Sequence, residues 1–292
     1  MLKHVPMVLC VLLLAACSAS DGGTDGTPPA ATTVAPASTV APAGTAASMP
    51  PAASVAAPVA AASSPAVPAA ASTPAPPATA ATAFVDDGKW VEGKNYFLIQ
   101  PAQPKVTETD KIEVVEAFSY GCPACDHAHA FIDKLAASLP SNAVMVYLPV
   151  AFRPDENWPV YQRAFYAAQA LGIAAKAHDA MFDATWKTGE TATYDLAAGK
   201  PKPQAQWPTI EDIAKFYSRF GVSADEFVAV ANSFSVNTKM KRAVELVKAY
   251  EVGETPTLVV DGKYRFTFTS AGGYAQGIEL AKWLVAREAA GK

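Results

Sequence analysis

The chain has few cysteines, and its N-terminal third has almost no charge. Only four cysteines occur among 292 residues, and two aspartates are the only charged side chains from position 18 to position 85. The formal net charge is −4, so no excess of basic side chains points to a nucleic-acid partner. The globular part therefore begins near Asp86, and residues 86–292 are enough for a substantial core.

Long hydrophobic runs are also absent. The run Val5–Ala16 follows Lys3 and is shorter than the roughly 20 apolar residues that a membrane-spanning helix needs. A short apolar run that ends in small residues is typical of an export signal. The Leu-Ala-Ala-Cys sequence that ends at Cys17 resembles the lipobox of bacterial lipoproteins, which predicts a signal peptide over residues 1–16 and acyl chains on Cys17. Ser18 favours sorting to the outer membrane, and the alternative is an ordinary signal peptide with an incidental cysteine.

Residues 17–85 are rich in alanine, proline, threonine and serine and have almost no large apolar side chains. Such a composition cannot build a core. We expect a disordered, lipid-anchored tether ahead of the folded domain.

Only Cys122 and Cys125 fall within the folded part, and they are three positions apart. A disulfide stabilises a fold by closing a long loop, and this pair closes almost none. The pair is therefore expected to serve chemistry rather than stability.

The pair follows a predicted strand, Ile112–Phe118, and opens a predicted helix from Pro123 to Leu139. Pro123 suits the first helical position, because its missing N–H would have no partner there. Cys122 then lies at the helix N-terminus, where the helix dipole favours a thiolate, and is the predicted nucleophile. Cys125 lies one turn later as the predicted resolving and more buried cysteine.

Other uses of these residues are less favoured. Attachment of c-type haem needs a histidine directly after the second cysteine, and His127 comes one place too late. His127 and His129 raise the question of zinc or copper, but residues two apart on a helix diverge by about 200°. We expect both histidines to occupy solvated or rim positions on the first helix. We expect His178 to be a residue of a later helix with a hydrogen-bond partner, and we expect no metal or cofactor.

Glu116 lies within the apolar strand, six positions before Cys122. It is either a solvent-facing acid at the strand exit or a buried acid beneath the helix. In the second case its pKa is raised, and it exchanges protons with Cys125.

The remaining pattern completes an α/β domain. A second strand is expected over residues 143–150, parallel to the first, followed by a helical insertion over about 154–252 with an exposed loop at 187–207. Thr257–Val260, an Asp-Gly turn and residues 264–269 predict a hairpin, and a last helix is expected over 274–289. Pro256, at the mouth of a strand, is either cis, leaving the preceding backbone open to a substrate chain, or an ordinary trans proline.

The sequence Glu116-Ala-Phe-Ser-Tyr-Gly-Cys-Pro-Ala-Cys125, the insertion, and Thr255-Pro256 resemble the DsbA family of thiol:disulfide interchange proteins. The resemblance implies a thioredoxin fold with an inserted helical domain. It also implies that Cys122 and Cys125 exchange disulfides, that Glu116 is the buried acid and that Pro256 is the cis-proline beside the pair.

Two positions depart from the family pattern. Ala124 stands where well-known members carry histidine, and Thr255 replaces a valine before the proline. A less stabilised thiolate makes a disulfide harder to reduce, so we expect a weaker oxidant.

The predicted function is therefore disulfide formation in reduced exported proteins of the periplasm. A DsbB-like, quinone-linked membrane protein is expected to reoxidise the enzyme. The alternatives are a reductase or isomerase on the same scaffold, and a metal-binding or chaperone module.

Overall fold

The computed structural model describes residues 84–292, so the predicted signal peptide, the lipid site Cys17 and nearly all of the tether lie outside the described residues. A five-stranded sheet organises the described part, in the order β1-β7-β6-β2-β3. Its strands are β1 (Phe97–Leu98), β2 (Ile112–Phe118), β3 (Ala143–Pro149), β6 (Thr257–Val260) and β7 (Tyr264–Thr267). Within residues 84–292, no helix has the length and apolar character needed to cross a membrane.

The centre of the sheet is the predicted strand–helix–strand unit. β2 and β3 pair in parallel, and α1 (Pro123–Ser138) connects them. β6 pairs antiparallel with β2 and continues through a tight turn into β7. Asp261 and Gly262 in this turn have φ of 51° and 67°, the left-handed conformation that favours an Asp-Gly sequence.

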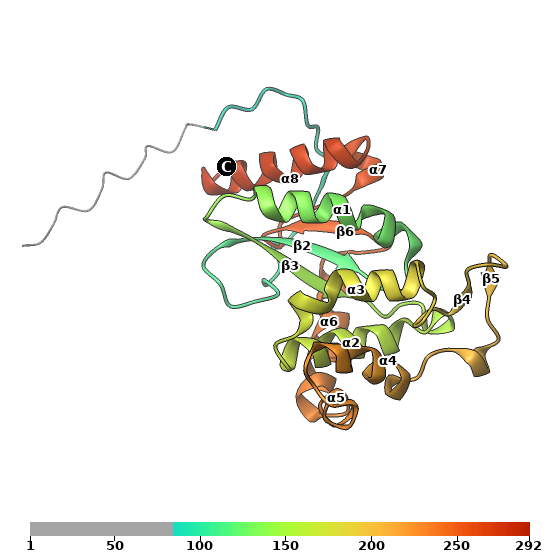
Figure 1. The fold of residues 1–292 in the computed structure, drawn as a ribbon. Helices are drawn as coiled ribbons and strands as arrows, with labels where there is room; N and C mark the ends of the chain where they lie inside the picture. Colours follow the sequence, from blue (N-terminus) through green and yellow to red (C-terminus); the bar gives the residue numbers. More distant parts are fainter. Residues whose placement is uncertain (1–83) are drawn as a thin grey trace, which may run out of the picture. The chain divides into compact units, whose positions relative to one another are not determined.

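The segment between β3 and β6 is the predicted helical insertion. Its elements are η1 (Pro154–Glu156), α2 (Trp158–Ala170), α3 (Ala174–Trp186), η2 (Gln204–Gln206), α4 (Ile210–Tyr217), η3 (Ser218–Phe220), α5 (Ala224–Ala231) and α6 (Phe234–Ala249). The expected exposed loop at 187–207 is more ordered than predicted. It contains a small hairpin of β4 (Tyr194–Asp195) and β5 (Lys200–Pro201), which projects beyond the helices in Figure 1, and Thr191 is buried.

Helices cover both faces of the sheet (Figure 1). α1 and α8 (Tyr274–Ala289) share a cluster with Val114 and Val260, whereas Val115 and Val259 pack into the cluster built with the insertion. This alternation follows the two-residue period of a strand and leaves β2 buried along its whole length.

Two elements differ from the sequence prediction. β1 was not predicted, and it adds an antiparallel edge strand to β7. The strand expected to run to Thr269 ends at Thr267, because the Thr267 side chain accepts a hydrogen bond from the Ser270 N–H and begins α7 (Phe268–Ala271).

Candidate active site

The predicted strand, turn and helix place Cys122 at the N-cap of α1. Its backbone is extended, its N–H donates to the Ser119 carbonyl at 3.1 Å, and Pro123 follows at the first helical position. Cys125 is fully buried and Cys122 is 4% exposed, as expected for a resolving and a reacting cysteine. Their sulfurs are not bonded to each other, so the structure describes the dithiol form.

The insertion fixes the turn before the pair, which sequence reasoning did not anticipate. A Cβ at Gly121 would lie 2.9 Å from Trp158 Nε1, so only glycine fits beneath this ring. Trp186 Nε1 donates to the Tyr120 carbonyl at 2.7 Å. The tryptophans of α2 and α3 thus hold the backbone that positions Cys122.

The Cys122 sulfur is surrounded by donors. The Cys125 N–H lies 3.3 Å from it and the Thr255 hydroxyl 3.2 Å from it, and both can donate to a thiolate. The Thr255 carbonyl oxygen lies 3.6 Å away and can accept from the thiol. Thr255 therefore contacts the reacting atom through both its side chain and its backbone.

These contacts separate the pKa values of the two thiols. The pKa of Cys122 is lowered to about 7, and the largest cause is a hydrogen bond from the Cys125 thiol. Hydrogen bonds from Thr255 and from the N–H groups of Cys125 and Ala124 lower the pKa further, whereas burial raises it. Burial raises the pKa of Cys125 well above its usual range, helped by its hydrogen bond to Cys122 and by the charge of Glu116. At neutral pH Cys122 is thus about half ionised, whereas Cys125 is protonated.

The loop before β6 brings the predicted proline to this site. The Thr255–Pro256 peptide bond is cis, which selects one of the two conformations that the sequence left open. Thr255 reaches Cys122 across 133 positions of sequence, a contact that no local pattern could predict.

Glu116 is buried, so the solvent-facing alternative is wrong. It pairs in register with Tyr147 of β3 and Leu258 of β6, and neither carboxylate oxygen has a hydrogen-bond partner. Burial raises the pKa of Glu116 to about 8, and the charges of Cys122 and Asp133 add to the effect. The carboxyl group is not hydrogen-bonded to Cys125, so proton transfer between them stays a prediction.

The histidines only partly follow expectation. His127 is exposed, as predicted. His129 is not a solvent-facing residue, because its ring packs against Phe182 of α3 with only 13% of its side chain exposed. His178 is buried and bonds the Tyr120 hydroxyl through Nδ1 at 2.8 Å, whereas its Nε2 has no partner.

The comparisons with known proteins bear on the family and the fold of the chain. No protein-family model matches the chain. It is 33% identical over 196 residues to the thiol:disulfide interchange protein DsbA of Azotobacter vinelandii, which covers 67% of this chain and 83% of the relative. It is 34% identical over 198 residues to the DsbA of Pseudomonas syringae, with coverage of 68% and 84%. The chain belongs to the DsbA family.

A solved DsbA structure has the same fold. The crystal structure of Pseudomonas aeruginosa DsbA superposes with a TM-score of 0.60 at 33% identity, covering 70% of this chain and 97% of that one. The likeness confirms the predicted thioredoxin fold with a helical insertion. As a DsbA-family protein, this chain is a thiol:disulfide oxidoreductase.

Proposed function

We propose that this DsbA-family protein donates the Cys122–Cys125 disulfide to reduced proteins exported to the periplasm. The observation that supports this direction is the unequal setting of the two thiols in the dithiol form. Donors around Cys122 lower its pKa to about 7 and so stabilise the reduced protein. A couple whose reduced form is stabilised gives up its disulfide readily.

The exchange has two steps that balance. A client thiolate attacks the Cys122 sulfur, which breaks the Cys122–Cys125 bond and releases Cys125 as a thiolate. Glu116, whose pKa is raised mainly by burial, supplies a proton to Cys125. A second client thiolate then attacks the client sulfur of the mixed disulfide, so that the client is oxidised and Cys122 leaves as a stabilised thiolate.

Thr255 and Pro256 contribute to the exchange because they lie beside the Cys122 sulfur. The Thr255 hydroxyl lies 3.2 Å from the Cys122 sulfur, which is the leaving sulfur of the second step. The backbone before Pro256 lies beside Cys122, where an extended client segment can pair with it. A DsbB-like, quinone-linked membrane protein accepts the two electrons and restores the disulfide.

The direction is tested by equilibrating the full chain with graded glutathione buffers, trapping free thiols by alkylation and counting them by mass. A Cys122→Ser, Cys125→Ser variant supplies the background from other thiols. We expect the pair to be more oxidising than glutathione. A potential more reducing than glutathione contradicts the proposal and favours a reductase or isomerase, the alternative that the missing histidine at Ala124 supports.

We also propose that the mature chain is anchored by acyl groups on Cys17, in the outer membrane as Ser18 favours. The support is the Leu-Ala-Ala-Cys sequence ending at Cys17 and the alanine- and proline-rich segment after it. Growth with a labelled fatty acid should label the protein, and Cys17→Ser should abolish the label. An unlabelled wild-type protein contradicts the anchor.

A further inference from the structure

A groove adjoins the edge of the sheet that carries Cys122. Pro149 pairs with Phe118 and Thr257 with Ala117, so β3 ends and β6 begins at the edge where β2 leads into the cysteine pair. The loop after β3 and the loop before β6 form two walls of the groove, and α2 and α6 form the others. Its volume is about 410 Å³. The helical insertion therefore helps to build a concave surface at the active-site edge of the sheet.

Apolar side chains line most of this groove. Phe152 comes from the loop after β3, Val252 from the loop before β6, and Val244 and Val247 from one face of α6. Val247 and Val252 are buried, whereas Phe152 and Val244 are 39% and 40% exposed. Single exposed apolar side chains are common on protein surfaces, but two that share one hollow with buried apolar neighbours indicate a binding site for an apolar group.

The polar part of the lining is small. Gln162 Nε2 of α2 donates to the Pro149 carbonyl at 2.8 Å, so this amide already has a partner. Among the described residues that line the groove, only Lys248 carries a charge, and its side chain is exposed one turn after Val244. Within residues 84–292, Lys248 forms no ion pair. The groove therefore offers an apolar interior with a single charge at its rim.

Both loops of the groove lead to Cys122. The ring centroids of Phe152 and Trp158 are 5.3 Å apart, and Trp158 covers the turn before the cysteine pair. Gly253 lines the groove two positions before Thr255, whose hydroxyl lies 3.2 Å from the Cys122 sulfur. Two residues of extended chain span about 7 Å at most, so the groove begins about two residues away from this contact. A polypeptide bonded to Cys122 through a cysteine can therefore reach the groove with its next few residues.

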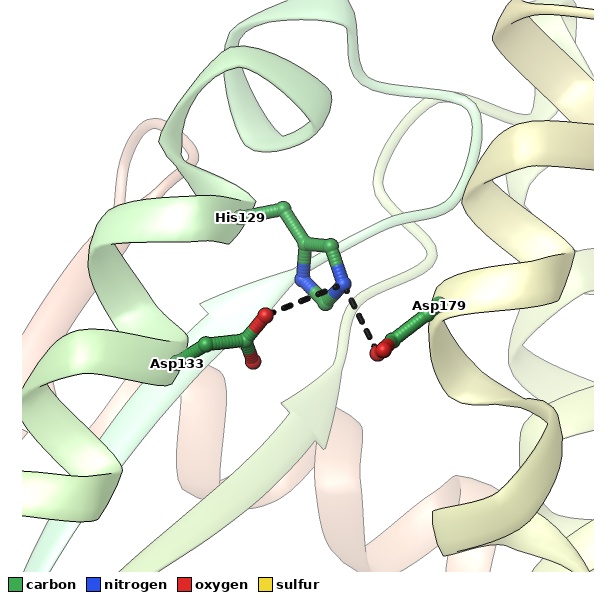
Figure 2. Close-up of side chains that lie close together, drawn as sticks. All are labelled: His129, Asp133 and Asp179. Carbon is green, nitrogen blue, oxygen red and sulfur yellow. Dashed lines mark hydrogen bonds and ion pairs between the residues drawn. The ribbon is translucent and has the colours of Figure 1, made fainter.

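Two neighbouring surfaces carry more charge. A depression on the β7 side of the same loop has Glu254 and Arg265 in its lining. Where α1 meets α3, His129 Nε2 lies 3.0 Å from Asp179 and 3.8 Å from Asp133, as Figure 2 shows. An apolar side chain in either place would remove water from charged groups, which opposes binding. Of these three surfaces, the groove beside α6 is the one that suits an apolar side chain.

We propose that this groove binds an apolar side chain of the client polypeptide whose cysteine is bonded to Cys122. The side chain two positions from that cysteine lies about 7 Å along an extended segment and on the same side, which matches the span from Thr255 to Gly253. The inference rests on the proposed contact of an extended client with the backbone before Pro256. It holds for either direction of exchange, because both directions pass through the same mixed disulfide.

The preference is measured on the oxidised full chain with all thiols outside the Cys122–Cys125 pair alkylated. Two peptides with one cysteine each are compared: one has leucine two positions before and two positions after the cysteine, and the other has serine at both places. The peptide thiolate attacks the Cys122 sulfur and releases Cys125, which is trapped by alkylation and counted by mass. After correction for the intrinsic rates with oxidised glutathione, the leucine peptide should react about tenfold faster, because one leucine side chain is partly buried.

Variants of both walls test the position of the site. Val244→Gln puts a polar side chain into the groove and keeps a good helix former in α6. The leucine preference should fall to about twofold or less, with the rate of the serine peptide unchanged. Phe152→Ser should lower the same ratio from the opposite wall. Phe234→Ser is the matched control, because Phe234 is 86% exposed at the start of α6 and lies outside the groove, and this variant should keep the full preference.

Equal rates for the two peptides in the wild type overturn the proposal, as does a preference that survives both Val244→Gln and Phe152→Ser. Equal rates together with a dimer that Val244→Gln dissociates, measured by sedimentation, also overturn it and assign the groove to a second copy of the chain. A ratio of two rates for one protein does not depend on the potential of its cysteine pair. Failure of the groove therefore leaves the proposed direction of exchange standing.

Discussion

The two buried glutamates of β2 lie three positions apart on opposite faces of the strand and have opposite surroundings. Glu113 accepts hydrogen bonds from the N–H groups of Val106 and Thr107 at 2.8 Å and 2.9 Å, and from the Thr107 hydroxyl. Glu116 is equally buried and accepts none. Burial alone therefore does not determine the role of an acid, because the hydrogen-bond donors around it matter as well. Donors stabilise the charged form of the acid, whereas an apolar environment stabilises the neutral form.

The two cysteines repeat the contrast. Donors surround Cys122 and lower its pKa, whereas burial dominates at Cys125 and raises it. Glu116 and Cys125, at which burial is the largest effect on the pKa, hold protons at neutral pH. The two groups that have several donors are Glu113, which holds the preceding loop, and Cys122, the nucleophile.

Glu116→Gln is the change with the largest expected effect on this contrast. General acid catalysis typically contributes 10²- to 10⁴-fold, so we expect release of Cys125 from the disulfide to slow by about a hundredfold at pH 7. Stopped-flow reduction of the oxidised protein by a small thiol measures this rate. An unchanged rate removes Glu116 from the proton path and leaves it as a buried acid without a role in exchange.

The same substitution should change stability with pH. The pKa of Glu116 is raised from 4.5 to about 8, so the folded dithiol form holds a proton that the unfolded chain has lost between these values. Stability therefore falls as the pH rises from about 4.5 to about 8, and Glu116→Gln removes this loss. Urea unfolding should show the variant more stable by about 3 kcal/mol at pH 7 and no more stable at pH 4.

Glu113→Gln should have the opposite sign and a smaller size. An amide places an NH₂ group where the carboxylate accepts from Val106 and Thr107, so one backbone donor loses its partner. We expect a loss of about 2 kcal/mol in urea unfolding at pH 7, with disulfide exchange unchanged. If Glu113→Gln slows exchange as much as Glu116→Gln does, the distinction between the two acids is wrong.

The sequence predicted these features unevenly, and the reason is the range of the interactions. The boundaries of β2, α1 and α8 and the place of Cys122 depend on short-range periodicity and on a proline at a helix start, so they could be read locally. The two-residue β1 exists only because β7 is beside it.

The donors to Glu113 come from an irregular segment with no sequence signal, and the burial of His129 depends on α3, 50 positions away. The position of Pro256 beside the cysteine pair was predicted from the family resemblance and not from a local pattern. The sequence could not predict which hydrogen-bond donors surround each of the two buried acids.

Thr255→Val probes the contrast at the nucleophile, with the smallest expected effect. Valine keeps the shape of threonine but removes the hydroxyl that lies 3.2 Å from the Cys122 sulfur. A hydrogen bond to a charged group contributes about 1.5 kcal/mol, so the pKa of Cys122 should rise from about 7 by about one unit. Thiolate absorbance in the ultraviolet, followed across pH in the reduced protein, measures the shift.

Thr255→Ser restores a hydroxyl and should return the pKa toward that of the wild type, which separates the hydrogen bond from a packing effect. If valine and serine shift the pKa equally, the hydroxyl is not what stabilises the thiolate. The backbone N–H groups at the start of α1 and the Cys125 thiol then account for the low pKa of Cys122 without Thr255.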